Sequence, residues 1–258
     1  MKTFLITNKE LLEKYPSIGQ FNVRGKIVNI PSFYRGEGIT AVFPISYNKA
    51  TELINSDCIK PARLSMTKSL INITVFRFFE SPVGPYNELV ITIPVFNKPL
   101  INFPFIPLLL NKFSRKFGFH VLDIFQSTNI AVEHGNLLTG YPHNKSLIDL
   151  NFRKNNNTLS VDVYNNNGQM LILDSIRKGK RRISCSNYMT YYEKNDHLFQ
   201  IQMDIYATEE KLFRSSISVC RHPLASILRD LNVSGQSIQS IFYPEVVEVN
   251  PVTRKTIL

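Results

Sequence analysis

The sequence predicts a mainly β protein with a few short helices, in a single domain that spans residues 1–258. Apolar and polar residues alternate with a period of two in several segments, as half-buried strands require. Turn-forming residues separate these segments, and helical stripes are few. No repeat of fixed period and no linker-like stretch divides the chain, and a chain with 43% hydrophobic residues can bury a sizeable core.

The strand prediction rests first on residues 199–205, where four apolar residues alternate with Gln200, Gln202 and Asp204. Residues 159–163 repeat this alternation, and the Asn-Asn-Asn-Gly turn that follows predicts a hairpin with residues 170–173. Further runs rich in β-branched or aromatic residues lie at 39–45, 70–79, 89–95, 120–125, 147–152, 212–219 and 238–249. So many strands with small helices between them favour a mostly antiparallel sheet, closed into a barrel or folded into a sandwich.

Three short helices are expected. Pro223 suits the first turn of a helix, and the residues after it place an apolar stripe at i, i+3, i+4 and i+7: Leu224, Ile227, Leu228 and Leu231. A second, weaker candidate covers residues 49–55. A third begins at a cap on Ser127 or Thr128 and runs through Leu138, although it contains a glycine in its interior.

Composition narrows the class of protein. No apolar run approaches the ~18 residues of a membrane span, and residues 1–10 lack the features of a secretory signal, so we expect a soluble, cytoplasmic protein. The three cysteines, Cys58, Cys185 and Cys220, are far apart and lack paired metal-ligand spacing. We expect them to be reduced thiols that fill small gaps in the core. No metal or organic cofactor is indicated.

The net charge of +10 is densest at residues 177–182, where five cations surround a glycine. This segment could bind phosphate or an acidic partner, but a solvated turn is the favoured interpretation. It has no interleaved aromatic residues, and no helix-turn-helix pattern or zinc spacing accompanies it. Nucleic acid is therefore not a predicted partner, and nucleic-acid binding stays only as a minor alternative.

The segment 100–110, LINFPFIPLLL, is strongly apolar but contains Pro104 and Pro107. These prolines exclude a regular internal strand or helix. The segment is expected to pack over the core or between subunits. A lid over an apolar pocket, or a membrane-surface contact, is the alternative.

Familiar catalytic motifs for nucleotide binding, α/β-hydrolase and zinc-protease chemistry are absent. Two turns remain as candidates. Residues 81–88, SPVGPYNE, form a rigid turn that delivers Glu88 at the mouth of a strand, and residues 140–145, GYPHNK, form a second turn. A purely structural role is the alternative for each. The histidines outside these turns show no ligand spacing and are expected to be ordinary surface or core residues: His120, His134, His197 and His222.

Taken in order, these turns resemble the acetoacetate decarboxylase-like superfamily. Three segments show the resemblance most clearly: SPVGPYNELVI at 81–91, NIAVEHGNLLTGYPHNKS at 129–146 and IFYPEVVEV at 241–249. The whole region of similarity spans about 43–249. The resemblance implies a closed, mostly antiparallel β-barrel around a small apolar pocket. It also implies assembly into a homo-oligomer, a small-molecule ligand and no cofactor.

The resemblance also implies which residues form the site. In that family the turn reads Tyr-Pro-Lys-Lys; the first lysine forms a Schiff base with an oxo acid, and the second helps to lower its pKa. His143 and Asn144 occupy these positions here, and the family's preceding Arg-Glu pair falls on Asn136 and Leu137. Lys145 follows, but a shift of one strand position turns a side chain to the opposite face unless the turn is bulged. The implied site residues are His143, Glu88 and Lys145 for catalysis, and Arg35, Tyr86, Asn144 and Tyr141 for substrate binding.

Three functions stay open from the sequence. The first is a protein that binds a small oxo acid or a similar carbonyl or carboxylate compound, with altered or lost decarboxylase chemistry in which His143 acts as acid or base beside Glu88. The second is a non-catalytic protein that binds an apolar carboxylate or a lipid-like ligand. The third is a true decarboxylase, a carbon–carbon lyase, that uses Lys145.

Overall fold

The structure is a computed structural model that describes residues 5–97 and 117–257. The apolar segment 100–110, for which the sequence left a packed loop or a lid open, lies outside the described residues. Between 5–97 and 117–257, no helix has both the length and the apolar content needed to cross a membrane.

The described chain is mainly β, as the sequence predicts. Its strands are β1 (Gly19–Val23), β2 (Lys26–Ile30), β3 (Ser32–Ser46), β4 (Ile59–Pro61), β5 (Lys68–Glu80), β6 (Tyr86–Asn97), β7 (Phe117–Gln126), β8 (Asp149–Lys154), β9 (Thr158–Asn165), β10 (Gly168–Lys194), β11 (His197–Val219), β12 (Gly235–Gln236) and β13 (Gln239–Thr256). The helices are α1 (Asn8–Lys14), α2 (Tyr47–Glu52), α4 (Asn129–Leu138), α5 (Ser226–Asp230) and the 3-10 turn η1 (Pro223–Ala225).

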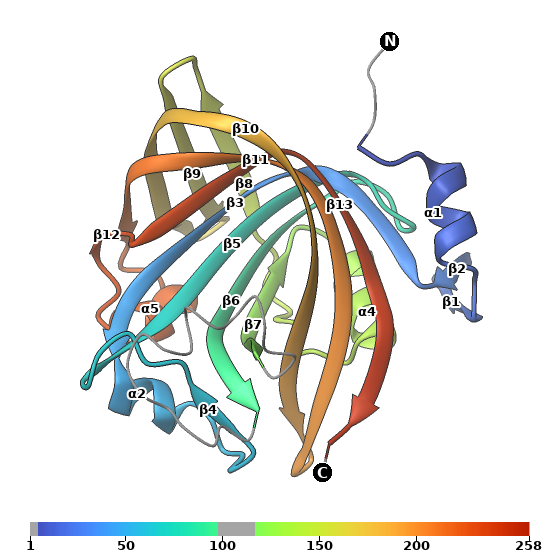
Figure 1. The fold of residues 1–258 in the computed structure, drawn as a ribbon, viewed down its shortest axis with the longest axis horizontal. Coiled ribbons are helices and arrows are strands. Elements are labelled where there is room, and N and C mark those ends of the chain that lie inside the picture. The colour runs from blue at the N-terminus through green and yellow to red at the C-terminus, as the bar shows by residue number, and fades with distance from the viewer. Residues whose placement is uncertain (1–4, 98–116, 258) are drawn as a thin grey trace.

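The large sheet has the strand order β12-β11-β13-β3-β5-β6-β7-β10-β9-β8. All its ladders are antiparallel except one: β7 and β10 pair in parallel over a short stretch. Because β10 also pairs with β11 along most of its length, the ladders lead from β11 through β13, β3, β5, β6 and β7 back to β10. Figure 1 shows these strands curving side by side, with α4 beside them.

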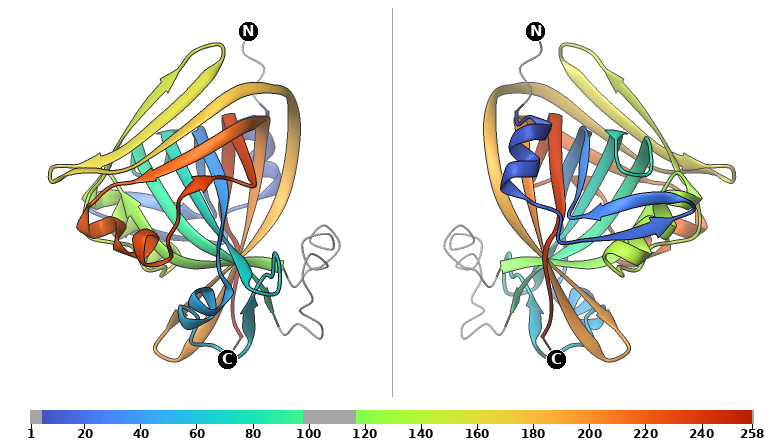
Figure 2. Two further views of the ribbon diagram at one scale, coloured as in Figure 1. Left: turned by 90° about the vertical axis from the view of Figure 1, so that its left-hand side faces the viewer. Right: turned by 90° about the vertical axis from the view of Figure 1, so that its right-hand side faces the viewer.

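Two groups of buried apolar residues lie on opposite faces of β3. Ile39, Ala41 and Phe43 belong to the larger cluster, which also takes side chains from β8, β9, the first part of β10, and α5. Tyr34 belongs to the second cluster, together with Ala131 of α4. The alternation of side chains along a strand produces this division. In Figure 2, β8 and β9 extend from one side of the molecule, and α1 lies on the other.

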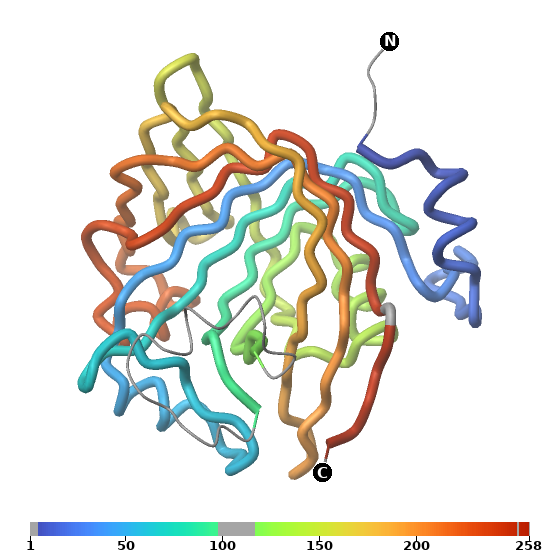
Figure 3. The backbone as a smooth tube through the Cα atoms, in the orientation of Figure 1, coloured from blue at the N-terminus to red at the C-terminus, as the bar shows by residue number. Residues whose placement is uncertain are grey.

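The longest strands, β10 and β11, have 27 and 23 residues and run side by side through the molecule, as Figure 3 shows. The basic segment 177–182 lies within β10, so the expected solvated turn is wrong. The register of β10 against β11 shifts between Arg177 and Arg181, which marks a bulge. Gly179 sits at this bulge, where a Cβ atom would lie 2.1 Å from the Lys211 carbonyl oxygen.

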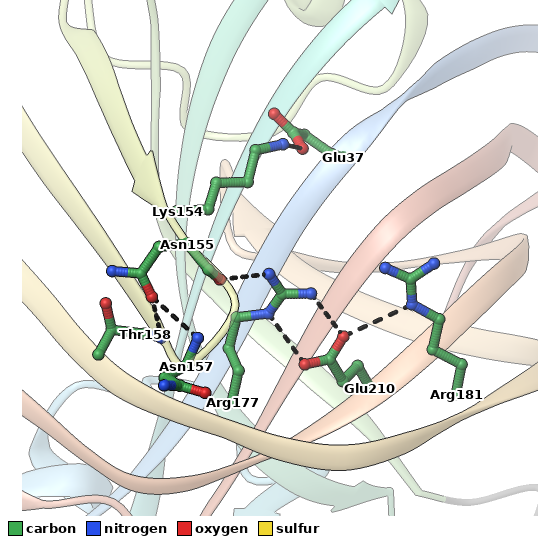
Figure 4. Close-up of polar contacts among 8 residues, drawn as sticks. All are labelled: Glu37, Lys154, Asn155, Asn157, Thr158, Arg177, Arg181 and Glu210. Carbon is green, nitrogen blue, oxygen red and sulfur yellow. Dashed lines mark hydrogen bonds and ion pairs between the residues drawn. The ribbon is translucent and has the colours of Figure 1, made fainter.

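Acidic side chains of β11 explain why so much positive charge can sit in a strand. Arg177 donates two hydrogen bonds to Glu210, at 2.9 and 2.8 Å, and Arg181 lies 3.6 Å from the same carboxylate. Arg182 pairs with Glu209. Figure 4 shows the Glu210 pair beside the ion pair of Lys154 and Glu37.

Most predicted elements are confirmed, including the hairpin of β9 and β10 and all three helices, with the expected cap of α4 at Thr128. The sequence did not predict α1, although Thr7 and Glu10 form a capping box there. Cys58 is buried as expected, but Cys185 is exposed, so it does not fill a core gap. All three cysteines are free thiols.

Candidate functional site

A cavity of about 420 Å³ lies among the inward faces of β3, β5, β6, β7, β10, β11 and β13, against α4. This volume is within the range of pockets that bind small molecules. Most of the lining is apolar, and the ionisable groups gather near α4 and the turn that follows it. Lysine and arginine are absent from the lining that residues 5–97 and 117–257 contribute.

Glu88 enters the cavity from β6. It faces Gln126 of β7 in the sheet register, and Gln126 Nε2 donates a 2.7 Å hydrogen bond to Glu88 Oε2. Burial raises the pKa of Glu88 to about 7, although hydrogen bonds from Gln126 and Tyr86 oppose the shift. The carboxyl group therefore exchanges its proton near neutral pH.

Glu248 enters from β13, where it pairs in register with Tyr34 of β3. Burial and then the charge of Glu88 raise its pKa to about 8, while a 3.3 Å hydrogen bond from Asn250 Nδ2 to Glu248 Oε1 acts in the other direction. Two buried carboxyl groups in one cavity thus hold their protons unusually strongly, because a second negative charge is unfavourable there.

His143 reaches the cavity because its turn is fixed against β7. The Asn144 amide donates to the Ile124 carbonyl at 2.7 Å, and the Ile124 amide donates to the Pro142 carbonyl at 3.2 Å. Both ring nitrogens of His143 are buried, and neither has a hydrogen-bond partner among the described groups. Burial and the nearby His134 lower the pKa of His143 to about 4, so its imidazole is neutral at pH 7.

Helix α4 supplies His134 and the glycine that makes room for His143. A Cβ atom on Gly135 would lie 2.2 Å from Cε1 of His143, so the imidazole packs directly against the helix backbone. This contact explains the glycine inside a helix, where it otherwise costs about 1 kcal/mol relative to alanine. His134 stacks on Phe21 at 5.7 Å between ring centroids, and burial lowers its pKa to about 4.

Five buried side-chain polar atoms without a described hydrogen-bond partner belong to residues of the cavity wall. They are Nε2 of His134, Nδ1 and Nε2 of His143, Oε1 of Gln126 and Oδ1 of Asn250. Each such atom costs roughly 1–3 kcal/mol if it stays unpaired. A bound molecule with both hydrogen-bond donors and acceptors would satisfy them.

The structure places four of the predicted site residues on the cavity wall: Glu88, His143, Tyr86 and Tyr141. Tyr141 is held in place by a hydrogen bond between its hydroxyl and that of Thr190. The cavity also receives Tyr34, Gln126, His134 and Glu248, which sequence reasoning did not propose as site residues.

The other three predicted site residues do not line the cavity. Arg35 is next to Tyr34 in β3, so it faces the opposite way, where its Nη2 donates to the Ile6 carbonyl at 2.7 Å. Asn144 donates to Asp123 Oδ2 at 3.3 Å. Lys145 is exposed and is not part of the cavity lining.

The described residues contain no cluster of three or more histidine, cysteine, aspartate or glutamate side chains that could hold a metal ion. Burial raises the pKa of all five tyrosines in the described lining, so these hydroxyls remain protonated hydrogen-bond donors at neutral pH: Tyr34, Tyr86, Tyr141, Tyr188 and Tyr243.

No protein-family model and no curated protein sequence matches this chain. Among solved structures, an acetoacetate decarboxylase from Legionella pneumophila is similar, with a TM-score of 0.65 and 12% identity over 100% of this chain and 98% of that chain. An acetoacetate decarboxylase-like enzyme from Sphingomonas wittichii has a TM-score of 0.54 and 10% identity, over 88% of this chain and 93% of that chain.

A third similar structure is the enduracididine biosynthesis enzyme MppR complexed with pyruvate. Its TM-score is 0.59 at 5% identity, over 88% of this chain and 90% of that chain. At such low identities the similarity concerns the fold. The chain therefore has an acetoacetate decarboxylase-like fold, as the resemblance of its turns implies.

Proposed function

We propose that the cavity binds a small oxo acid or a similar carbonyl compound and moves protons on it without a covalent bond to lysine. The observation that carries this proposal is the group of two carboxyls and two imidazoles at one end of an apolar cavity, with five buried polar atoms in need of partners. Such perturbed ionisable groups in a pocket are typical of active sites.

The pKa values suggest how the proton moves. Glu88, with a pKa of about 7, is matched to neutral pH as a base that removes a proton from the carbon beside a carbonyl. The electron pair of the broken C–H bond shifts to the carbonyl oxygen, which takes a proton from Glu248, with its pKa of about 8. The neutral imidazole of His143 serves as the adjacent acid–base group and hydrogen-bond donor. The product is the enol.

The same arrangement supports altered rather than conserved decarboxylase chemistry. A Schiff base needs a neutral amine within reach of the carbonyl. Lys145 is exposed and is not among the lining residues. A carbonyl group that accepts hydrogen bonds is a weaker electron acceptor than an iminium ion. We therefore expect proton exchange rather than rapid loss of carbon dioxide.

The first test is exchange of carbon-bound hydrogen in deuterium oxide, followed by NMR with acetoacetate and 2-oxobutanoate. We expect the protein to accelerate exchange and the Glu88→Gln and His143→Ala variants to lose about 10²-fold or more in rate. Lys145→Ala is the matched control and should keep the parental rate. Equal rates for the parent, Glu88→Gln and His143→Ala would overturn the proposal.

The decarboxylase alternative is tested with borohydride and acetoacetate, followed by intact-mass analysis. We expect no adduct. An adduct that peptide mapping places on Lys145 would replace our proposal with the Schiff-base mechanism.

A second candidate function is binding without catalysis. It is favoured by the largely apolar lining and by the absence of a lysine or arginine from the lining within the described ranges. Saturable ligand binding in the absence of any hydrogen exchange would select this function.

We also propose a single domain over residues 1–258, a sheet that closes around the cavity, assembly into a homo-oligomer and a cytoplasmic location. The ladder from β10 back to β11 supports the closed sheet. Light scattering on the purified protein would test the homo-oligomer, because its mass should be a multiple of 29.7 kDa.

A further inference from the structure

The cavity extends well beyond the ionisable groups. Along β6 its lining runs from Tyr86 and Glu88 through Val90 and Thr92 to Pro94. Pro94 lies six residues from Glu88, which is about 20 Å along a strand. It pairs in register with Phe119 of β7. One end of the cavity is therefore rich in acids and imidazoles, and the other is apolar and aromatic.

We infer that the ligand is a neutral carbonyl compound with an aliphatic tail. Its carbonyl lies beside Glu88 and His143, and its tail follows β6 toward Phe119. This inference rests on the proposed function. It narrows the ligands of that function, small oxo acids and similar carbonyl compounds, to neutral carbonyl compounds. A four-carbon oxo acid has about seven non-hydrogen atoms, far fewer than a pocket of about 420 Å³ accommodates.

The middle of the cavity is suited to a tail because its polar side chains pair with one another. Thr40 and Thr74 share a hydrogen bond of 2.9 Å between their hydroxyls. Asn72 Nδ2 lies 3.2 Å from Thr74 Oγ1 and 3.3 Å from Thr92 Oγ1. These side chains already have hydrogen-bond partners in the protein, so an aliphatic chain can lie beside them without leaving a polar group unpaired.

The charge of the site favours a neutral head group. Glu88 carries negative charge once the pH exceeds about 7, and the imidazoles of His134 and His143 are neutral there. The described lining offers no lysine or arginine to offset a second anion. A buried carboxylate without a cation is unfavourable, whereas a ketone or aldehyde accepts hydrogen bonds at no such cost.

The test uses two homologous series, 2-alkanones from butanone to dodecanone and the 3-oxo acids of matching length, with affinity measured by calorimetry. We expect each added methylene of a ketone to tighten binding about fourfold, since a buried CH2 contributes about 0.8 kcal/mol, until the tail fills the cavity. We also expect each ketone to bind more tightly than its matched oxo acid above pH 7.

A substitution in the cavity wall should weaken the binding of long ligands more than that of short ones. The sheet registers place Val42, Asn72 and Thr92 at one level, four residues or about 13 Å beyond Glu88. Val42→Phe should weaken the longest ketones at least tenfold and leave the shortest unchanged. Val42→Leu, which adds less volume, is the matched control and should retain most of the affinity for long ketones.

The outcomes are distinguishable. If short oxo acids and ketones bind but affinity does not depend on tail length, this inference is wrong and the proposed function stands. If oxo acids bind more tightly than matched ketones, the neutral head group is wrong. If no compound of either series binds, both the proposed function and this inference fail. The length series on the parent protein decides these points even if Val42→Phe does not fold.

Discussion

The buried carboxyl group of Glu37 and the two buried carboxyl groups of the cavity lie in different surroundings. Outside the cavity, Glu37 of β3 is 2% exposed and accepts hydrogen bonds from Arg77 and Lys154. Inside it, Glu88 and Glu248 are 9% and 6% exposed, and their hydrogen-bond partners are amides and a tyrosine hydroxyl. All three groups are buried, but only Glu37 among them is neutralised by cations.

This difference separates the acid of a structural ion-pair network, Glu37, from the candidate functional acids of the cavity. The two cations offset the cost of burying the Glu37 carboxyl group, and together the three side chains link β3, β5 and β8. Arg177 lowers the pKa of Glu210 through its hydrogen bonds (Figure 4). Burial without a cation raises the pKa of Glu88 and Glu248, because their ionised forms are unfavourable in the cavity. Such a group is useful for proton transfer near neutral pH.

The largest effect is expected from Glu37→Gln. This change leaves Arg77 and Lys154 without their shared carboxylate, and breaking a pair of this kind should lower the free energy of unfolding by about 3 kcal/mol. This value is at the lower end of the range of about 3–5 kcal/mol for breaking a buried ion pair, because both cations are partly exposed. Urea denaturation at pH 7 measures the loss. Glu88→Gln is the matched exchange inside the cavity, and an equal loss there would contradict the distinction.

Glu248→Gln is expected to change stability in a pH-dependent way. The unfolded chain releases this proton near pH 4.5, and the folded protein holds it until about pH 8. The parent therefore loses stability as the pH rises across that interval, and the loss is complete above it. The variant lacks this loss, so it should exceed the parent by a few kcal/mol at pH 9 and match it at pH 4.

Thermal and urea unfolding at both pH values would measure this difference. Glu245→Gln, on the same strand but outside the cavity lining, is the matched control for loss of a carboxyl group. A Glu248→Gln variant that is less stable than the parent at pH 9 would show that the carboxylate is neutralised by a group we have not assigned.

Gly135→Ala tests how closely His143 packs on α4. Alanine favours a helix, but its Cβ would overlap the imidazole, and overpacking of this kind costs about 1–3 kcal/mol. We expect a net loss of about 1 kcal/mol or more, and a gain for the exposed neighbour Asn136→Ala. The added change His143→Ala should recover most of the loss. If the changes in stability caused by Gly135→Ala and His143→Ala are additive in this double-mutant cycle, the two residues are not in contact.

The smallest effect is expected at the helix caps. Thr128 accepts a 3.2 Å hydrogen bond from the Ala131 amide at the start of α4, and Thr7 caps α1 in the same manner. Replacement of either threonine by alanine should cost about 1 kcal/mol. Only Thr128→Ala should also weaken ligand binding, because α4 carries His134 and Gly135. Equal binding by both variants would show that the site does not depend on the cap.

The period of two in the sequence was sufficient to predict most strands, and the capping residues Ser127 and Thr128 were sufficient to predict the start of α4. The basic segment 177–182 misled the prediction because its charges are balanced by Glu209 and Glu210, which lie about thirty residues later. Local sequence cannot show such pairing. The bulge at Gly179 likewise depends on a close approach to Lys211 across the sheet.

The site was predicted only in part for a related reason. Glu88 and His143 stand in distinctive turns, so the chain itself marks them. Glu248 lies among Val246, Val247 and Val249, all buried, and this run has no alternation to show which face meets the cavity. The buried imidazole of His134 was interpreted as ordinary because its importance depends on residues from β13 and the turn after α4. Spatial convergence of this kind follows from the fold.

The position of the larger apolar cluster has an evolutionary consequence. That cluster lies on the face of β3 that points away from the cavity, and it includes β8, β9 and α5. Substitutions in the cavity wall therefore leave most of the stabilising core untouched. Selection can exchange the chemical groups of the cavity at little cost in folding, which allows one architecture to persist while its ligands and reactions diverge.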